Sequence, residues 1–256
     1  MIRHVRAAAV CLVALAALGP ACYADVAVQK EEFSLALPDG WVEIPQDVLA
    51  AARDKIAQAA PGATIPKYDY GFQLAVNKWM QYPYILVQLS DQGRIPEQQL
   101  EKLPKLDLSA ALDGRADALK ALMSGVSLGH MQYDDNARLI WLSSQSEMPG
   151  IGTIHGLSGL IPTQTGALQL HCYALDASID TLLPLFRQVV ASARPSPALA
   201  YQPSPAATAA AAAPSTAPPA ATGFDWRMAV RRTALGIFIG GAVAWVLRIR
   251  SRKKRA

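Results

Sequence analysis

Alternation of apolar and polar side chains marks several short strands, and turn-forming residues separate them. In the first half of the chain, a Pro38-Asp39-Gly40 turn stands between two such segments, and a turn near Gln81-Tyr82-Pro83 stands between two more. We therefore expect neighbouring segments to pair in an antiparallel way. The four segments are Phe33–Leu37, Trp41–Ile44, Tyr70–Val76 and Tyr84–Ser90.

The second half of the chain contains two stronger hairpin patterns. Ser127–Tyr133 and Arg138–Ser146 flank Asp134-Asp135-Asn136, a sequence that favours a tight turn. Gly152–Ile161 and Ala167–Ala174 flank a second turn of polar residues. Both patterns predict antiparallel strand pairs.

Apolar residues at helical spacing predict four helices between these strands. Pro45 opens the first helix, and Pro61-Gly62 ends it. A short helix is expected over Pro96–Leu103, a longer one over Leu108–Met123, and the last one over Ser178–Ala193. Hairpins separated by helices, in place of strict strand–helix alternation, predict an α+β fold with an antiparallel meander sheet flanked by helices.

The N-terminus has the three zones of a secretory signal peptide, which are a positive region, a short apolar stretch and small residues. We expect residues 1–24 to be removed by cleavage after Ala24, and residues 25–194 to form one exported domain with a real core. A lipid group on Cys22 is the alternative. That site prefers leucine three residues earlier, where this chain has Gly19.

The C-terminal part combines a linker, an apolar helix and a basic tail. Residues 195–222 are mostly Ala and Pro with Ser and Thr, so we expect a disordered linker. Residues 223–249 contain an apolar run bounded by arginines, with Trp226 and Trp245 placed as in the aromatic belts of a membrane span. We expect one transmembrane helix there, followed by a cytoplasmic tail over residues 250–256. A basic helix on the membrane surface is the alternative, which the apolar run disfavours because it has no polar face.

The charge distribution supports the same topology. Residues 25–200 carry thirteen Lys/Arg against nineteen Asp/Glu, a net charge of −6, whereas residues 223–256 carry nine Lys/Arg against one Asp, a net charge of +8. The positive-inside rule places the basic tail in the cytoplasm and the exported domain in the periplasm, at a bacterial inner membrane. The acidic domain offers no basic stripe, so we expect no nucleic-acid partner.

Small residues recur at every fourth position of the predicted span, at Gly236, Gly240 and Ala244. This spacing lets two helices approach closely. It predicts a homodimer through this helix face, although glycine and alanine are also common in spans that remain single.

No pattern in the domain has the spacing of a catalytic or metal site, so we expect no catalytic residue, cofactor or metal. His130, His155 and His171 lie in expected strands without zinc-site spacing, although the strands could bring them together. Ser158 lies in an incomplete nucleophile-elbow sequence. A two-residue loop at the second hairpin would place it opposite His171, without an evident acid. Cys172, the remaining cysteine after signal cleavage, is expected to be buried.

Five aromatic residues gather around one expected strand pair. Core and edge packing explains most of such a cluster, and an exposed member would suit a contact with a protein or a glycan. The five are Tyr68, Tyr70, Trp79, Tyr82 and Tyr84.

The opening sequence Phe33-Ser-Leu-Ala-Leu-Pro-Asp-Gly-Trp41, the antiparallel sheet and the closing amphipathic helix resemble the PsbP-like family over roughly residues 28–194. That family is named after an extrinsic accessory protein of photosystem II and has an α/β/α sandwich fold. The resemblance implies this fold and a non-enzymatic accessory or binding role. It carries no catalytic residues to transfer.

The sequence therefore favours a membrane-tethered periplasmic accessory or binding module with an envelope protein as its partner. The alternative is a cell-envelope enzyme of hydrolase type with an unrecognised site in the exported domain. A polar pocket would favour the enzyme, and an exposed aromatic patch would favour the binding module.

Overall fold

The structure, a computed structural model of the chain, describes residues 25–61, 65–100, 102–105 and 124–202. The expected signal peptide, the helix expected over Leu108–Met123, most of the expected linker and the expected membrane span lie outside these residues. Among the helices that the structure describes, none is long and apolar enough to cross a membrane.

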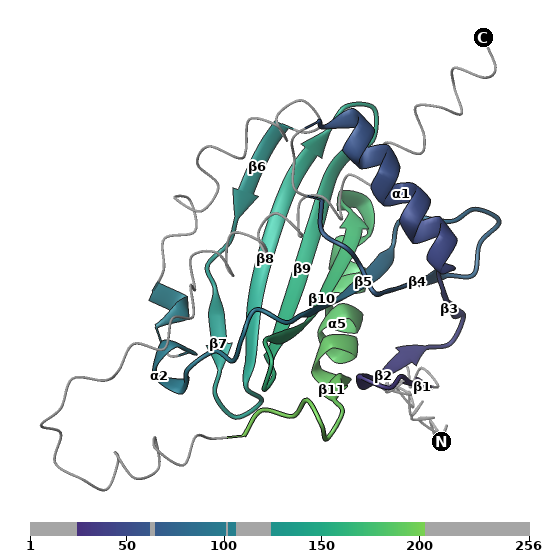
Figure 1. The fold of residues 1–256 in the computed structure, drawn as a ribbon. Coiled ribbons are helices and arrows are strands. Elements are labelled where there is room, and N and C mark those ends of the chain that lie inside the picture. The colour runs from purple at the N-terminus through teal and green to yellow at the C-terminus, as the bar shows by residue number, and fades with distance from the viewer. Residues whose placement is uncertain (1–24, 62–64, 101, 106–123, 203–256) are drawn as a thin grey trace, which may run out of the picture.

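An eight-stranded antiparallel sheet forms the centre of the domain, in the order β3-β4-β5-β10-β9-β8-β6, with β7 also paired to β8 (Figure 1). The β5–β10 pair joins two meanders, β3-β4-β5 and β10-β9-β8, where we expected one. The strands are β3 (Trp41–Glu43), β4 (Tyr70–Leu74), β5 (Tyr84–Ser90), β6 (Ser124–Leu128), β7 (Gln132–Asp134), β8 (Leu139–Met148), β9 (Gly152–Pro162) and β10 (Ala167–Leu175).

A second, three-stranded sheet has the order β1-β2-β11. The expected hairpin between the first two sequence segments is wrong, because β2 pairs with β1 and β11, whereas β3 pairs with β4. Gly40, whose φ is 81°, turns the chain from one sheet into the other. Phe33 and Trp41 on the two sides of this turn belong to one buried cluster. The two strands therefore pack against each other from different sheets and do not pair within the same sheet. The strands are β1 (Asp25–Gln29), β2 (Phe33–Pro38) and β11 (Arg194–Pro195).

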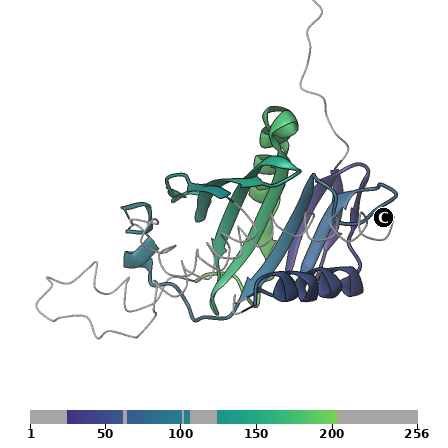
Figure 2. The ribbon, with the colours of Figure 1, turned by 90° about the horizontal axis from the view of Figure 1, so that it is seen from above.

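Helices cover both faces of the large sheet, as expected (Figure 2). Helix α1 (Gln46–Ala59) buries Leu49, Ala52 and Ile56 on one face, and α5 (Asp176–Ser192) buries Phe186, Val189 and Val190 on the other. The short helix α2 (Glu97–Leu100) and the 3-10 turn η1 (Leu103–Lys105) contribute to a third cluster. This cluster lies on the same sheet face as α1, where α2 and η1 pack against Ile140 and Leu160. The described residues therefore form an α+β domain with an antiparallel sheet between helices.

Strand β10 lies at the centre of this arrangement and is buried on both faces. Leu168, Leu170 and Cys172 point toward α5, and the alternate positions point toward the opposite face. Cys172 is fully buried as expected, and burial raises the pKa of its thiol. The thiol therefore stays protonated and unreactive.

The folded domain continues past residue 194, through part of the range that composition assigns to the linker. The Ser196 amide donates to Glu32 O at 2.7 Å, and the Gln164 amide donates to Leu199 O at 3.0 Å. The Tyr201 hydroxyl donates to Ile95 O at 2.7 Å. Residues 195–202 are thus tied across one end of the sheet.

Gly159 on β9 lets α5 approach the sheet closely, because a Cβ atom at this position would overlap Cγ1 of Val190. We expect Gly159→Ala to lower the free energy of unfolding by about 1–3 kcal/mol, since the helix must shift. Urea unfolding followed by tryptophan fluorescence measures this change. The loss in the double variant Gly159→Ala/Val190→Ala should be smaller than the sum of the single losses. Strict additivity would contradict the contact.

Candidate functional site

The three histidines of the domain do not come together. His155 and His171 lie on the paired strands β9 and β10 but on opposite faces of the sheet, since His155 pairs with Ala174 on the α5 face. His155 Nε2 lies 2.8 Å from Asp176 Oδ1, and His130 lies in the loop between β6 and β7, outside the strand expected for it. Among the described residues, no group of three His, Cys, Asp or Glu side chains is placed to hold a metal ion.

Ser158 and His171 do meet, as the hairpin predicts. The Thr163 amide donates to Gly166 O at 2.9 Å, which closes the turn and sets Ser158 opposite His171. Ser158 Oγ lies 2.8 Å from His171 Nδ1. Both side chains are buried, Ser158 at 1% and His171 at 0% relative exposure, and within the described part of the chain His171 Nε2 has no hydrogen-bond partner. A serine enclosed in this way, beside a histidine that no carboxylate of the described residues orients, is poorly placed to attack a substrate.

These two residues belong to a buried polar strip on the sheet face opposite α5. Gln88 and Gln169 pair across β5 and β10 on the same face, and neither side-chain oxygen has a partner among the residues described. Burial lowers the pKa of His171 to about 3, because the apolar surroundings disfavour the imidazolium. The strip therefore holds a neutral histidine at physiological pH.

His171 makes the stability of the domain sensitive to acid. Its pKa is 6.5 in an unfolded chain and about 3 in the fold, so only the unfolded state gains this proton as the pH falls below 6.5. We expect a loss of up to about 1.4 kcal/mol of unfolding free energy per pH unit in this window. The His171→Gln variant should lack this loss in urea unfolding between pH 7 and pH 5. The matched variant His130→Gln, at an exposed position, should keep it. Equal slopes in the two variants would contradict the assignment.

Among the five clustered aromatic residues, Trp79 is the exposed one. Tyr68 and Tyr84 are buried, and Tyr70 and Tyr82 are half-buried. The relative solvent exposure of Trp79 is 40%, and that of Val76 on the same loop is 49%. The expected cluster thus divides into a packed part and one exposed tryptophan.

The loop that carries Trp79, residues 75–83 between β4 and β5, is fixed from the inside by Gln73. This side chain is fully buried, its Oε1 accepts from the Met80 amide at 2.6 Å, and its Nε2 donates to Lys78 O at 2.9 Å. Met80 is itself buried and has a φ of 58°. Because the backbone on both sides of Trp79 is bonded, the indole is presented with little conformational entropy to lose on binding.

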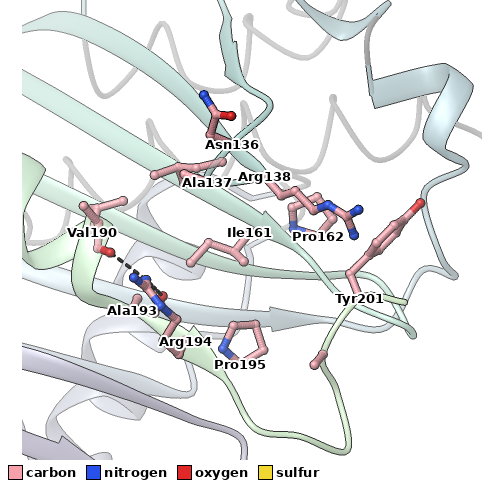
Figure 3. A pocket seen from close by; sticks show the side chains of 13 residues that line it. Asn136, Ala137, Arg138, Ile161, Pro162, Val190, Ala193, Arg194, Pro195 and Tyr201 are labelled. Carbon is pink, nitrogen blue, oxygen red and sulfur yellow. Dashed lines mark hydrogen bonds between the residues drawn. The ribbon is translucent and has the colours of Figure 1, made fainter. Parts of the chain in front are cut away.

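A groove of about 320 Å³ lies at the opposite end of the central strands (Figure 3). It runs between the C-terminal end of α5, the ends of β8 and β9, and the segment of residues 195–202. Ile161 lies in its centre, with Arg138 and Tyr201 on one side and Arg194 on the other. Apolar side chains form most of its floor, and arginines stand at its rim.

The residues that shape these two surfaces have little local sequence signal. Gln73 reads as one polar position of an alternating strand, and Tyr201 lies in an Ala/Pro-rich stretch. Their partners are distant along the chain or fixed only by the fold, as Arg94 Nη2 shows by donating to Gln202 O at 2.8 Å. An isolated tyrosine in the expected linker was the available signal.

The described elements define an α+β sandwich with an antiparallel central sheet. Comparison with protein-family models and with curated protein sequences gives no match.

Two solved structures have a similar arrangement. The solution structure of cyanobacterial PsbP (CyanoP) from Synechocystis sp. PCC 6803 has a TM-score of 0.43 and 15% identity, over 70% of this chain and 95% of that one. The crystal structure of LpqN, involved in cell envelope biogenesis of Mycobacterium tuberculosis, has a TM-score of 0.35 and 17% identity. The match covers 69% of this chain and 92% of that one. The first likeness agrees with the PsbP-like resemblance of the sequence.

Proposed function

We propose that this chain is a membrane-tethered periplasmic accessory module that binds an envelope protein through the β4–β5 loop. The observation that supports this function is the exposed Trp79 side chain on a loop whose backbone Gln73 fixes. Tryptophan is enriched among the residues that contribute most to protein–protein binding, because it buries a large area with few rotatable bonds.

The surroundings of Trp79 fit a protein contact. Val76 adds a second exposed apolar side chain, and Lys78 between them is exposed and charged. An apolar centre with a polar edge is the usual composition of a protein-binding patch. Preorganisation by Gln73 reduces the entropic cost of binding.

The position of the loop also fits a tethered domain. Tyr84, next to the loop, pairs with Tyr173 near one end of β10, whereas Ser90 pairs with Ala167 at the other end. The last described residue, Gln202, lies at this second end, beside Arg94. If the tether begins at Gln202, the Trp79 loop lies at the end of the domain opposite the tether.

The enzyme alternative has weaker support. Its best candidate, the Ser158–His171 contact, is enclosed, and burial keeps His171 neutral. No carboxylate among the described residues orients this histidine. A hydrolase would need a hydroxyl that a substrate can reach. The binding module therefore remains the function that the geometry supports best.

A photo-crosslinking amino acid at position 76 of the full chain tests the contact in cells of the native host. We expect a discrete adduct with a partner protein, and we expect Trp79→Ala to lower its yield several-fold, since a central aromatic anchor contributes about 2 kcal/mol or more. The matched change Val26→Ala removes an equally exposed apolar side chain elsewhere, on β1, and should leave the yield unchanged. An adduct yield that is unchanged by Trp79→Ala would contradict the proposed surface.

Reporter fusions to the chain test the proposed topology. Alkaline phosphatase fused after Gln202 should be active, because it folds only outside the cytoplasm. The same enzyme fused after Ala256 should be inactive, and a green fluorescent protein there should fluoresce, since the basic tail is retained inside. Active phosphatase at both positions would show that the tail is not cytoplasmic.

A further inference from the structure

We propose that the groove beside Tyr201 binds a small carboxylate with a short aliphatic body, and that Arg138 holds the carboxylate. This site is separate from the Trp79 loop and does not depend on the function proposed above. Its volume of about 320 Å³ lies at the lower end of the range for ligand pockets, about 300–1,000 Å³. The ligand is therefore a small molecule.

The Arg138 guanidinium is oriented by Tyr201 and Glu97. It lies 5.4 Å from the centre of the Tyr201 ring, and it forms one long ion pair with a described side chain, 3.5 Å from Nη2 to Glu97 Oε1. A guanidinium carries five N–H donors in a planar fork that matches a carboxylate. Among the described residues, Glu97 is the one hydrogen-bond acceptor of this guanidinium, which leaves donors for a ligand.

Tyr201 acts as the fixed wall of the site. Its hydroxyl donates to Ile95 O at 2.7 Å, and the Arg94 guanidinium lies 4.3 Å from its ring centre, so the ring lies near two guanidinium groups. The half-buried Tyr201 ring therefore has two positive charges within 5.4 Å of its centre. An anionic group beside this ring would be attracted by both charges.

The charges around the groove favour an anion. Arg94, Arg138 and Arg194 face it or its wall, and the acidic groups near them are Glu97 and Asp135. Further along α5, Arg187 lies over the Trp141 ring at 5.3 Å. Four of the five arginines in the described part of the chain therefore lie at the groove, at its Tyr201 wall or over Trp141. The net charge of the domain as a whole is negative.

The end of α5 fixes the direction in which the ligand lies. Arg194 Nη1 already donates to Ala191 O at 2.6 Å and to Ala193 O at 2.7 Å, so this arginine serves the helix terminus. The last carbonyl groups of a helix carry partial negative charge, which repels an anion. The carboxylate accordingly binds at Arg138, and the aliphatic body lies over Ile161 toward Val190.

The backbone of Arg138 is consistent with a binding role. Its φ of 48° lies in the left-handed region, which glycine or asparagine adopts more easily. For other residues this backbone conformation is less stable by roughly 1–2 kcal/mol. The preceding turn residues, Asn136 and Ala137, also line the groove. An arginine at this strained position is explained if its guanidinium is needed there.

Saturation-transfer NMR with hexanoate as the probe tests the site, using the full chain in lipid nanodiscs and empty nanodiscs as a blank. We expect hexanoate to bind and its neutral analogue hexanamide to bind about tenfold more weakly or not at all, since the charge-assisted bonds are lost. Arg138→Gln should weaken hexanoate binding about tenfold. Arg53→Gln removes the same charge from an exposed position on α1 and should change it less than twofold.

Arg138→Gly separates binding from folding, because glycine relieves the left-handed backbone. This variant should be at least as stable as the parent chain in thermal unfolding and should still lose hexanoate binding. Three results would overturn the proposal: no hexanoate binding by the parent chain at millimolar concentration, equal binding of hexanoate and hexanamide, or equal effects of the Arg138→Gln and Arg53→Gln substitutions. None of these measurements involves the Trp79 loop.

Discussion

The pairing of β5 with β10 is the interaction on which the rest of the domain depends. It runs from Tyr84↔Tyr173 to Ser90↔Ala167 and joins two meanders that are far apart in the sequence. Because β10 then lies in the middle of the sheet, both of its faces must be covered. Helix α1 covers one face and α5 the other, and Gly159 allows α5 to lie close enough to close the core.

This central position also decides which chemistry the domain can offer. The polar residues Ser158, Gln169 and His171 lie inside the sandwich, and burial keeps the histidine neutral. Unpaired polar groups there cost free energy, about 1–3 kcal/mol each when no water or ligand satisfies them. A partner or a substrate meets the domain more readily at the ends of the strands, where loops carry side chains outward.

Local patterns predicted those parts of the fold that local interactions determine. Helices α1 and α5, the β7–β8 and β9–β10 hairpins and the Ser158–His171 contact follow from periodicity and turn length. The Pro38-Asp39-Gly40 turn shows the limit, since a turn sequence does not tell which sheet the next strand will join. The β11 strand and the ordered residues 195–202 depend on partners distant in the sequence, and an Ala/Pro-rich composition hides them.

The Trp79 loop and the groove owe their shape to such distant or internal contacts, and this explains why no motif revealed them. At one end of the sheet, buried Gln73 bonds the backbone around an exposed indole. At the other end, Arg94 and Arg138 lie against Tyr201, which the chain reaches only after α5 has returned along the sheet. Strand β10 spans roughly 30 Å between these ends, at about 3.4 Å per residue. Two surfaces so far apart on a rigid sheet can bind independently, so a ligand in the groove need not compete with a protein at the loop.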